Sequence, residues 1–244
     1  MPIYVPGKVV LKKESVAADP YYNNVSLLLH GDGANGSTTI VDNSPTPKTV
    51  TAVGNAQIST AASKFGGASI LFNGSTDYLS LPKSEFVDFG TSDFTIEAWC
   101  RFSSSTDVSI MSGVGPTNGT LMLRRLSDGT LRIGRTYVAW DLTSSVLSWN
   151  TNQFYHIAAT RSSGTAYLFR DGVEVASGSN TESYSFAGSG DSIWAVGASQ
   201  SSSNVFSPGL FFNGYIDDLR ITKGVARYTA NFTPPTAPFP EVWG

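Results

Sequence analysis

Acidic side chains are the first candidates for chemistry, and the glutamates among them are few and far apart. They are Glu14, Glu85, Glu97, Glu174, Glu182 and Glu241. A retaining glycosidase needs two carboxyl groups about 5 Å apart, and a strand supplies them from alternate positions, as in the pattern E-x-D-x-x-E. No two glutamates have this spacing, and Glu97 has no partner carboxylate on its own predicted strand. We therefore expect no catalytic residues and a protein that is not an enzyme.

Histidine and cysteine provide few further candidates for catalysis or metal binding. His30 and His156 are the only histidines, and Cys100 is the only cysteine. This set is too small for an ordinary four-ligand zinc site, and no G-x-S-x-G turn presents a serine nucleophile. His156 alternates with Phe154 and Ala158, which favours a buried structural histidine. Cys100 is predicted to be a small apolar core residue.

Aromatic residues beside polar ones form the best candidate binding site. Sugars stack their C–H faces on aromatic rings, and their hydroxyl groups need hydrogen-bond partners. The candidate carbohydrate-binding residues are Tyr137, Trp140, Asp141, Trp149 and Asn150. Each ring could instead fill the core, because large aromatic side chains do so in β-sandwiches.

Two further features of the strands bear on a binding surface. Trp99 lies beside Glu97 on the strand face opposite Phe94 and Ile96, and that face is either a concave lectin surface or one that packs on the second sheet. The pair Arg124–Arg125 is interpreted as a solvated strand edge, which discourages edge-to-edge pairing.

Short strands separated by turns must position these side chains. Residues 94–102 alternate with period two, with Phe94 and Ile96 on one face and Thr95 and Glu97 on the other. Two Asp-Gly pairs, Asp128–Gly129 and Asp171–Gly172, indicate hairpins. Helical periodicity is nearly absent, apart from one turn around residues 84–89. The pattern predicts an all-β protein with two antiparallel sheets.

The chain divides into an N-terminal arm (1–24), a domain (25–232) and a proline-rich C-terminal tail (233–244), with both ends extended. One short strand is predicted at residues 9–11. No signal peptide is visible, and no apolar run approaches the ~20 residues that cross a membrane. The net charge of −3 has no basic stripe, so nucleic acid is not an expected partner.

Five segments in order resemble the laminin G-like, concanavalin A-like lectin/glucanase superfamily. They are L27-LLHGDG-33, K64-FGGASILFNG-74 with D77-YL-79, D93-FTIEAW-99, F154-YHIAATR-161 with the following hairpin, and N213-GYIDDLRIT-222 with G224-VARY-228. The resemblance covers about residues 25–240 and implies a jelly-roll sandwich. It does not imply one function, since this fold carries lectins, adhesins, glucanases and structural modules.

The resemblance also suggests a cofactor. Related jelly rolls hold a structural calcium ion between the turn after the first strand and an aspartate in the last strand. Those positions are Asp32 and Asp218 here, with a carbonyl near Gly31 or Gly33. The alternative is that Asp32 shapes its turn and Asp218 accepts hydrogen bonds from loop amides.

The closing segment through Thr233–Pro235 looks like bacteriophage versions of the fold. The leading hypothesis is therefore a non-enzymatic virion surface protein, a capsid decoration or tail fibre component made in the host cytoplasm. Its partners would be other virion proteins and copies of itself. The alternative hypothesis is a carbohydrate-binding or adhesin module that recognises a cell-surface glycan.

Overall fold

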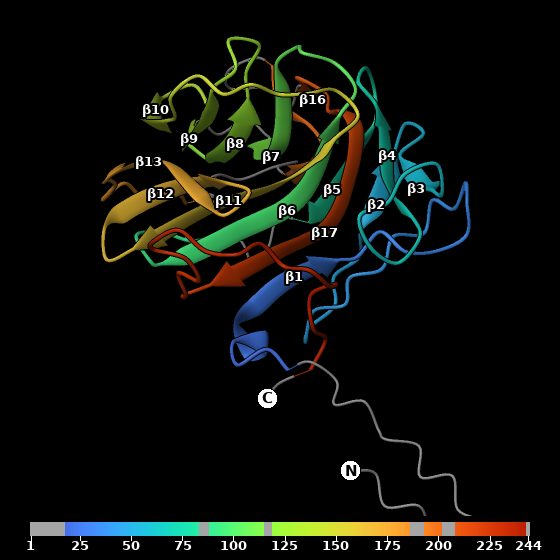
Figure 1. The fold of residues 1–244 in the computed structure, drawn as a ribbon, viewed down its shortest axis with the longest axis horizontal. Coiled ribbons are helices and arrows are strands. Elements are labelled where there is room, and N and C mark those ends of the chain that lie inside the picture. Colours follow the sequence, from blue (N-terminus) through green and yellow to red (C-terminus); the bar gives the residue numbers. More distant parts are fainter. Residues whose placement is uncertain (1–17, 83–87, 115–118, 186–192, 202–207, 243–244) are drawn as a thin grey trace, which may run out of the picture.

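The structure is a computed structural model, and it describes residues 18–82, 88–114, 119–185, 193–201 and 208–242. In this part of the chain, two large antiparallel sheets pack face to face, and the one helical element is a short 3-10 turn, η1 (Tyr22–Asn24) (Figure 1). The predicted all-β jelly-roll sandwich is confirmed. No helix among these residues is long and apolar enough to cross a membrane.

The first sheet has eight strands. In spatial order they are β13 (Val173–Ser179), β12 (Thr165–Arg170), β11 (Phe154–Ser162), β6 (Phe94–Phe102), β17 (Asn213–Lys223), β4 (Ser69–Asn73) and β3 (Gln57–Ser59), with β1 (Val25–Leu29) also paired to β17. The long strands β6, β11 and β17 lie at its centre, so the sequence motifs of the strands are neighbours in space.

The second sheet has seven strands. In spatial order they are β10 (Ala139–Thr143), β9 (Leu131–Arg135), β8 (Leu121–Arg125), β7 (Val108–Val114), β14 (Ile193–Val196), β5 (Tyr78–Pro82) and β2 (Thr51–Val53). A small hairpin of β15 (Ser199–Gln200) and β16 (Pro208–Gly209) lies next to β7.

The core between the sheets follows the predicted alternation of β6. Phe94, Ile96, Ala98, Cys100 and Phe102 are all buried in the main hydrophobic cluster. Burial of each large apolar side chain contributes roughly 1.5–3 kcal/mol. The cysteine is buried and free, as expected for a small apolar residue.

The Asp171–Gly172 turn shows how local chemistry directs the chain. Both residues have positive φ, 52° and 77°, as a two-residue type I′ hairpin requires. A β-carbon at Gly172 would lie 1.9 Å from the carbonyl oxygen of Phe232. Glycine therefore allows the C-terminal segment to cross this turn closely. The Asp128–Gly129 hairpin between β8 and β9 is also present as predicted.

The C-terminal segment covers the outer face of the eight-stranded sheet. Thr95 and Thr160 donate hydrogen bonds to the carbonyl oxygens of Val225 and Tyr228, at 2.9 and 2.7 Å. Further along, Phe239 is buried in a small cluster with Val25 and Leu28. The predicted proline-rich tail therefore packs on the body of the domain through its described residues.

Both ends of the described chain meet at one corner. The backbone N–H of Asp19 donates to the carbonyl oxygen of Val242 at 2.9 Å. This corner and η1 lie at the bottom of Figure 1, whereas β8, β9 and β10 lie at the top. The predicted strand at 9–11 lies outside the described residues, as does most of the predicted helical turn at 84–89.

One interpretation of the sequence is wrong. Arg124 and Arg125 do not lie at a solvated edge, because β8 is paired on both sides, to β7 and β9. Arg125 is only 2% exposed and lies over the ring of Phe102, 4.7 Å from its centre. Two adjacent arginines suggest a solvent-exposed position when only their residue type is considered. Alternation along the strand instead directs the side chain of Arg125 inward and that of Arg124 outward.

Candidate functional site

The outer face of β8, β9 and β10 carries a pocket of about 460 Å³, which we call the β8–β10 pocket. Leu121 and Leu123 point into the core, so Met122 and Arg124 point outward. The register then aligns three strands: Met122 pairs with Gly134, and Gly134 pairs with Trp140. The pocket is therefore built by neighbouring outward positions on one sheet.

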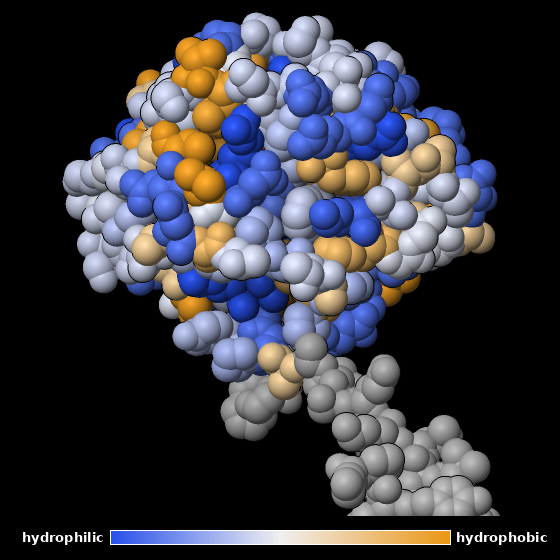
Figure 2. Space-filling view, in the orientation of Figure 1, coloured by the Kyte–Doolittle hydropathy of each residue, from blue (hydrophilic) through white to orange (hydrophobic). Residues whose placement is uncertain are grey.

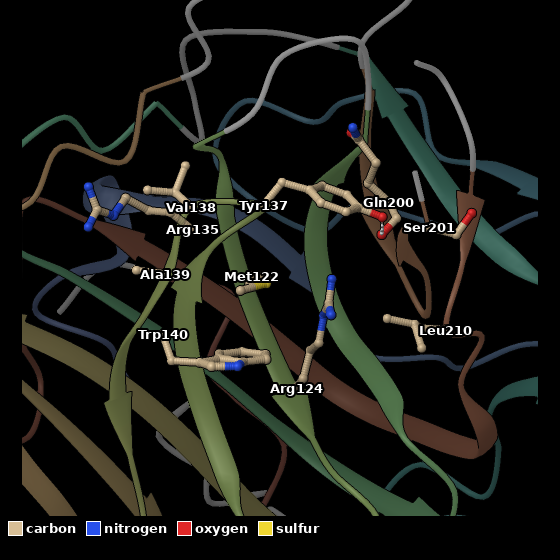
Figure 3. A pocket seen from close by; sticks show the side chains of 10 residues that line it. All are labelled: Met122, Arg124, Arg135, Tyr137, Val138, Ala139, Trp140, Gln200, Ser201 and Leu210. Atoms are coloured by element: carbon tan, nitrogen blue, oxygen red, sulfur yellow. Dashed lines mark hydrogen bonds between the residues drawn. The ribbon is translucent and has the colours of Figure 1, made fainter. Parts of the chain in front are cut away.

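Gly134 permits this arrangement. A β-carbon there would lie 2.4 Å from the carbonyl oxygen of Ala139 and 2.9 Å from the Cα atom of Trp140. Without a side chain at Gly134, β10 approaches β9 and sets Trp140 on the floor of the pocket. Figure 3 shows the Trp140 ring on one side of the pocket and the Tyr137 ring on the other.

The two rings differ in how they are held. Tyr137 has a positive φ of 53°, is 47% exposed, and directs its hydroxyl toward the carbonyl oxygen of Gln200 at 3.5 Å. Trp140 is half-buried, and the centre of its ring lies 5.6 Å from the guanidinium group of Arg124 and 5.3 Å from that of Arg132. Rings fixed in this way present flat faces at little entropic cost.

Arg124 stands in the middle of the pocket (Figure 3). Its Nη2 donates to the hydroxyl of Ser199, which donates in turn to Ser112 Oγ at 2.9 Å. Its Nε is buried and has no acceptor within the described residues. Burial lowers the pKa of Arg124 to about 10, so the charge is desolvated.

Asp141 lies beside the pocket but is already paired. Arg135 donates to both of its carboxylate oxygens, at 2.9 to 3.2 Å, and also contacts Glu182 at 2.6 Å. In Figure 3 the Arg135 side chain points away from Arg124 and Trp140. Asp141 therefore orients Arg135 and is not poised to accept sugar hydroxyl groups.

Trp149 and Asn150 do not join the other three candidates. The Trp149 ring packs edge-on against Phe102 and Tyr155, and its Nε1 donates to the carbonyl oxygen of Gly129 at 2.9 Å. Asn150 is exposed beside it and is held by Tyr155. Of the five predicted residues, the structure brings Tyr137, Trp140 and Asp141 to one place, and Trp149 is a packing residue.

The predicted calcium ligands lie at the other end of the molecule. Both oxygens of Asp218 already have partners: His30 Nδ1 at 2.6 Å and the backbone N–H of Phe239 at 2.9 Å. Asp218 thus accepts a loop amide, as the alternative interpretation proposed. Although burial lowers the pKa of His30, the hydrogen bond and charge of Asp218 raise it above its usual value.

Asp217, which the sequence analysis did not single out, has a better oxygen for a cation. Its Oδ2 accepts the N–H groups of Lys64 and Phe65, while its buried Oδ1 has no hydrogen-bond partner within the described residues. Asp32 lies against Gly66, which directly follows Lys64 and Phe65 in the chain. Burial, together with the charges of Asp218 and Asp32, raises the pKa of Asp217 to about 7.

This pair alone is a small ligand set for calcium. Calcium takes six to eight oxygen ligands, and the described residues hold no group of three or more acidic, histidine or cysteine side chains suited to a metal ion. Asp32 and Asp217 fit a cation site only with backbone carbonyl groups or water completing it. Calcium therefore stays a prediction, with Asp217 as its best-placed carboxylate.

Glu97 lies at the centre of a buried ionic cluster, which we call the Glu97 network. Its members are Asp19, Glu97, His156, Arg220, Arg227 and Tyr228. Arg220 donates to Glu97 Oε1 at 2.7 Å and to Asp19 at 3.0 Å. Burial alone would raise the pKa of Glu97, but Arg220 and its neighbours lower it to about 2.

The Glu97 network is sealed from solvent. Glu97 and His156 are fully buried, and Phe239 covers the Arg220 guanidinium at 3.7 Å. The face of β6 that carries Glu97 and Trp99 is therefore buried under other segments of the chain, such as those of Lys64 and Tyr228, and it does not pack on the second sheet as one interpretation of the sequence had it. Among the described residues, the other acidic member of the cluster, Asp19, is bound by two arginines rather than aimed at a cavity.

The family model described as concanavalin A-like lectin/glucanases superfamily matches residues 73–227. The chain belongs to this superfamily. None of the curated proteins matches the sequence.

Solved structures share the fold at low identity. Domain 4 of AbnA, a GH43 extracellular arabinanase from Geobacillus stearothermophilus in complex with arabinotriose, is 19% identical, with a TM-score of 0.57 over 82% of this chain and 92% of that one. The binding domain of botulinum neurotoxin DC in complex with SialylT is 14% identical, with a TM-score of 0.55. The same domain in complex with rat synaptotagmin II is 15% identical, with a TM-score of 0.57.

These neighbours differ in the share of their own length that the alignment covers. The alignments with the neurotoxin domains cover 84% of this chain but only 50% of those chains, so this protein spans about half of their length. At these identities the likeness shows the fold alone.

Proposed function

We propose that this protein is a non-catalytic carbohydrate-binding module whose ligand stacks on Trp140 in the β8–β10 pocket. The observation that carries the proposal is the half-buried ring of Trp140, which lines the pocket opposite Tyr137 and lies near the guanidinium groups of Arg124 and Arg132. A ring in this setting can pack on the C–H face of a sugar, while Arg124 and nearby backbone groups offer hydrogen bonds.

The surface supports a polar ligand. On the face drawn in Figure 2, hydrophobic residues form small patches separated by polar ones, rather than one continuous apolar area. Stable protein interfaces usually have an apolar centre, whereas sugar sites combine isolated rings with polar groups. The solved complexes with arabinotriose and SialylT concern other proteins, but they agree with a saccharide ligand for this fold.

The ion pairing of the acidic groups supports a non-catalytic role. Glu97 is held ionised by Arg220 inside a sealed network, and Asp141 is bound by Arg135. Neither is paired with a second carboxyl group across a pocket, as glycoside hydrolysis requires. We therefore expect binding without release of reducing sugar from β-glucans.

A glycan array tests the proposal. We expect the wild-type protein to bind a subset of glycans and Trp140→Ala to lose that binding. Tyr215→Ala is the matched control, because Tyr215 is also a ring beside an arginine, Arg101, but lies on the other sheet. Unchanged binding by Trp140→Ala, or equal loss in both variants, would refute the pocket as the sugar site.

We further propose that the module is displayed on a bacteriophage virion surface, where it joins other virion proteins and copies of itself. The support is the sequence resemblance to phage versions and the position of Asp19 and Val242 at the corner opposite the pocket, which would let an anchored domain face outward. Removal of residues 1–17, which spares Asp19, should abolish incorporation into particles while the domain stays folded. Normal incorporation would reject anchoring by the arm.

A further inference from the structure

Arg124 differs from its neighbours in lacking a counter-ion. Arg132 pairs with Asp128, and Arg135 pairs with Asp141 and Glu182. No ion pair of Arg124 occurs within the described residues, and its acceptor there is the neutral hydroxyl of Ser199. The charge of Asp107 acts on Arg124, but the two form no ion pair, so the pocket holds a positive charge that no carboxylate of the described residues contacts.

The charge is also costly where it lies. Arg124 and Arg132 are direct cross-strand partners, and like charges in that position repel each other. Burial removes water from the Arg124 guanidinium, and a buried cation normally has a partner. An arginine that retains its charge here is poised to pair with an anionic group that enters the pocket.

Neighbouring side chains orient this charge. Ser199 accepts from Nη2 and is itself tied to Ser112 on β7, while the Trp140 ring lies beside the guanidinium. The planar group is thus fixed at the centre of the pocket, within reach of a molecule stacked on Trp140 (Figure 3). Guanidinium groups bind carboxylates with planar, charge-assisted hydrogen bonds.

We infer that the β8–β10 pocket recognises an acidic saccharide, with the sugar carboxylate bound by Arg124 and the sugar ring on Trp140. The inference rests on the proposed carbohydrate-binding function and names its ligand class. A carboxylate on a sugar can come from a sialic acid or from a uronic acid, and both present the same chemistry to Arg124.

Paired acidic and neutral probes test the inference by isothermal titration calorimetry. The probes are 3′-sialyllactose against lactose, and trigalacturonate against its methyl ester. We expect at least one acidic probe to bind about tenfold or more tightly than its neutral counterpart, because hydrogen bonds to charged groups contribute about 1.5–3 kcal/mol. The pair that shows the preference identifies the source of the carboxylate.

Arg124→Gln should abolish that preference, so that the acidic and neutral probes bind with similar affinity. Arg132→Gln is the matched control, because it removes the same charge beside the same ring but from an arginine already paired with Asp128. It should keep the preference. Thermal melts of both variants confirm that they are folded, and Arg124→Lys, which keeps the charge without the planar fork, should restore only part of it.

The outcomes separate the two proposals. Equal affinity for acidic and neutral probes, no binding of either acidic probe, or an equal loss in Arg124→Gln and Arg132→Gln would overturn the acidic ligand. The carbohydrate-binding function would survive any of these if the array signal still depends on Trp140. Loss of the Trp140 dependence would instead overturn the function itself.

Discussion

The outer faces of the two sheets treat buried charge in opposite ways. On the eight-stranded sheet, the Glu97 network pairs every arginine with a carboxylate and lies under the C-terminal segment. On the seven-stranded sheet, Arg124 forms no ion pair with a carboxylate of the described residues and faces a pocket. Paired, covered charge fixes the position of a segment, whereas unpaired charge beside an open ring is available to a ligand. We therefore expect mutations to affect mainly stability on the first face and mainly binding on the second.

The largest effect should come from breaking the Glu97 network. Glu97→Ala leaves Arg220 buried without its main partner, and loss of one member of a buried ion pair costs about 3–5 kcal/mol. Urea unfolding followed by tryptophan fluorescence measures the change. Glu182→Ala is the matched control, because its pair with Arg135 is exposed at the Glu182 side and should contribute less than about 1 kcal/mol. A similar small cost for both would contradict the role of the network.

Removal of the Phe239 ring, which covers the Glu97 network, should have the next largest effect on stability. Phe239→Ala deletes a ring that is 3% exposed and packs on Arg220, Val25 and Leu28, so we expect a loss of about 3 kcal/mol in the free energy of unfolding. Glycan affinity at the opposite pole should not change. A fall in affinity without a fall in stability would show that the two faces are coupled.

Asp217 should give a smaller effect of opposite sign. Its pKa rises from 3.8 to about 7 in the folded protein, so the unfolded chain releases this proton first as pH increases. Asp217 therefore lowers stability progressively as pH rises between these two pKa values, and above the higher one the loss stays constant. We expect Asp217→Asn to raise the melting temperature by a few degrees at pH 7.5 in the presence of a chelator, and to have little effect near pH 4. An equal shift at both pH values would exclude titration of Asp217 as the cause.

Addition of calcium provides a second test of Asp217. If the ion binds Asp217 and Asp32, calcium should raise the melting temperature of the wild-type protein at pH 7.5, and the gain should vanish in Asp217→Asn and Asp32→Asn. Asp42→Asn is not a suitable control, because Asp42 caps a buried turn through four hydrogen bonds. The exposed Asp171 would serve better. If calcium does not change the melting temperature of the wild-type protein, the predicted calcium site is wrong.

The smallest change in stability should come from Arg124→Gln. The substitution removes a desolvated charge and a like-charge contact with Arg132, and it loses one hydrogen bond to Ser199. We expect the free energy of unfolding to change by less than about 1 kcal/mol. A loss as large as that of Glu97→Ala would mean that Arg124 has a structural role, and it would weaken the contrast between the two faces.

The sandwich was predictable because period-two alternation and Asp-Gly turns are local signals. The alternation of residues 94–102 and the turn at 171–172 reported the strands and hairpin that the structure contains. The three-residue strands β2 and β3 were missed, since they are too short to show a period and depend on pairing with β5 and β4.

The site was only partly predictable. Trp140 and Trp149 have the same chemistry, and only the packing of Trp149 on Phe102 separates a core residue from a surface ring. Arg124 was misjudged although β8 pairs with the strands directly before and after it in the sequence, β7 and β9, and although the alternation of Arg124 with Leu123 was visible. The sequence pointed to Asp218 as the calcium ligand, whereas Asp217 is better placed for a cation in the structure. The pairing of β17 with β6 is irregular between residues 217 and 220, where Asp218 adopts a φ of 47°, so simple alternation along the strand does not tell the two side chains apart.

The hydrogen bond between Asp19 and Val242 also has a consequence for engineering. When the two ends of a domain meet, the domain can be inserted into a surface loop of another protein or circularly permuted with a short connecting peptide. New termini could then be opened in the exposed stretch around Val146. Because the corner that would be joined lies far from β8–β10 in the fold, such a rearrangement should leave the β8–β10 pocket intact.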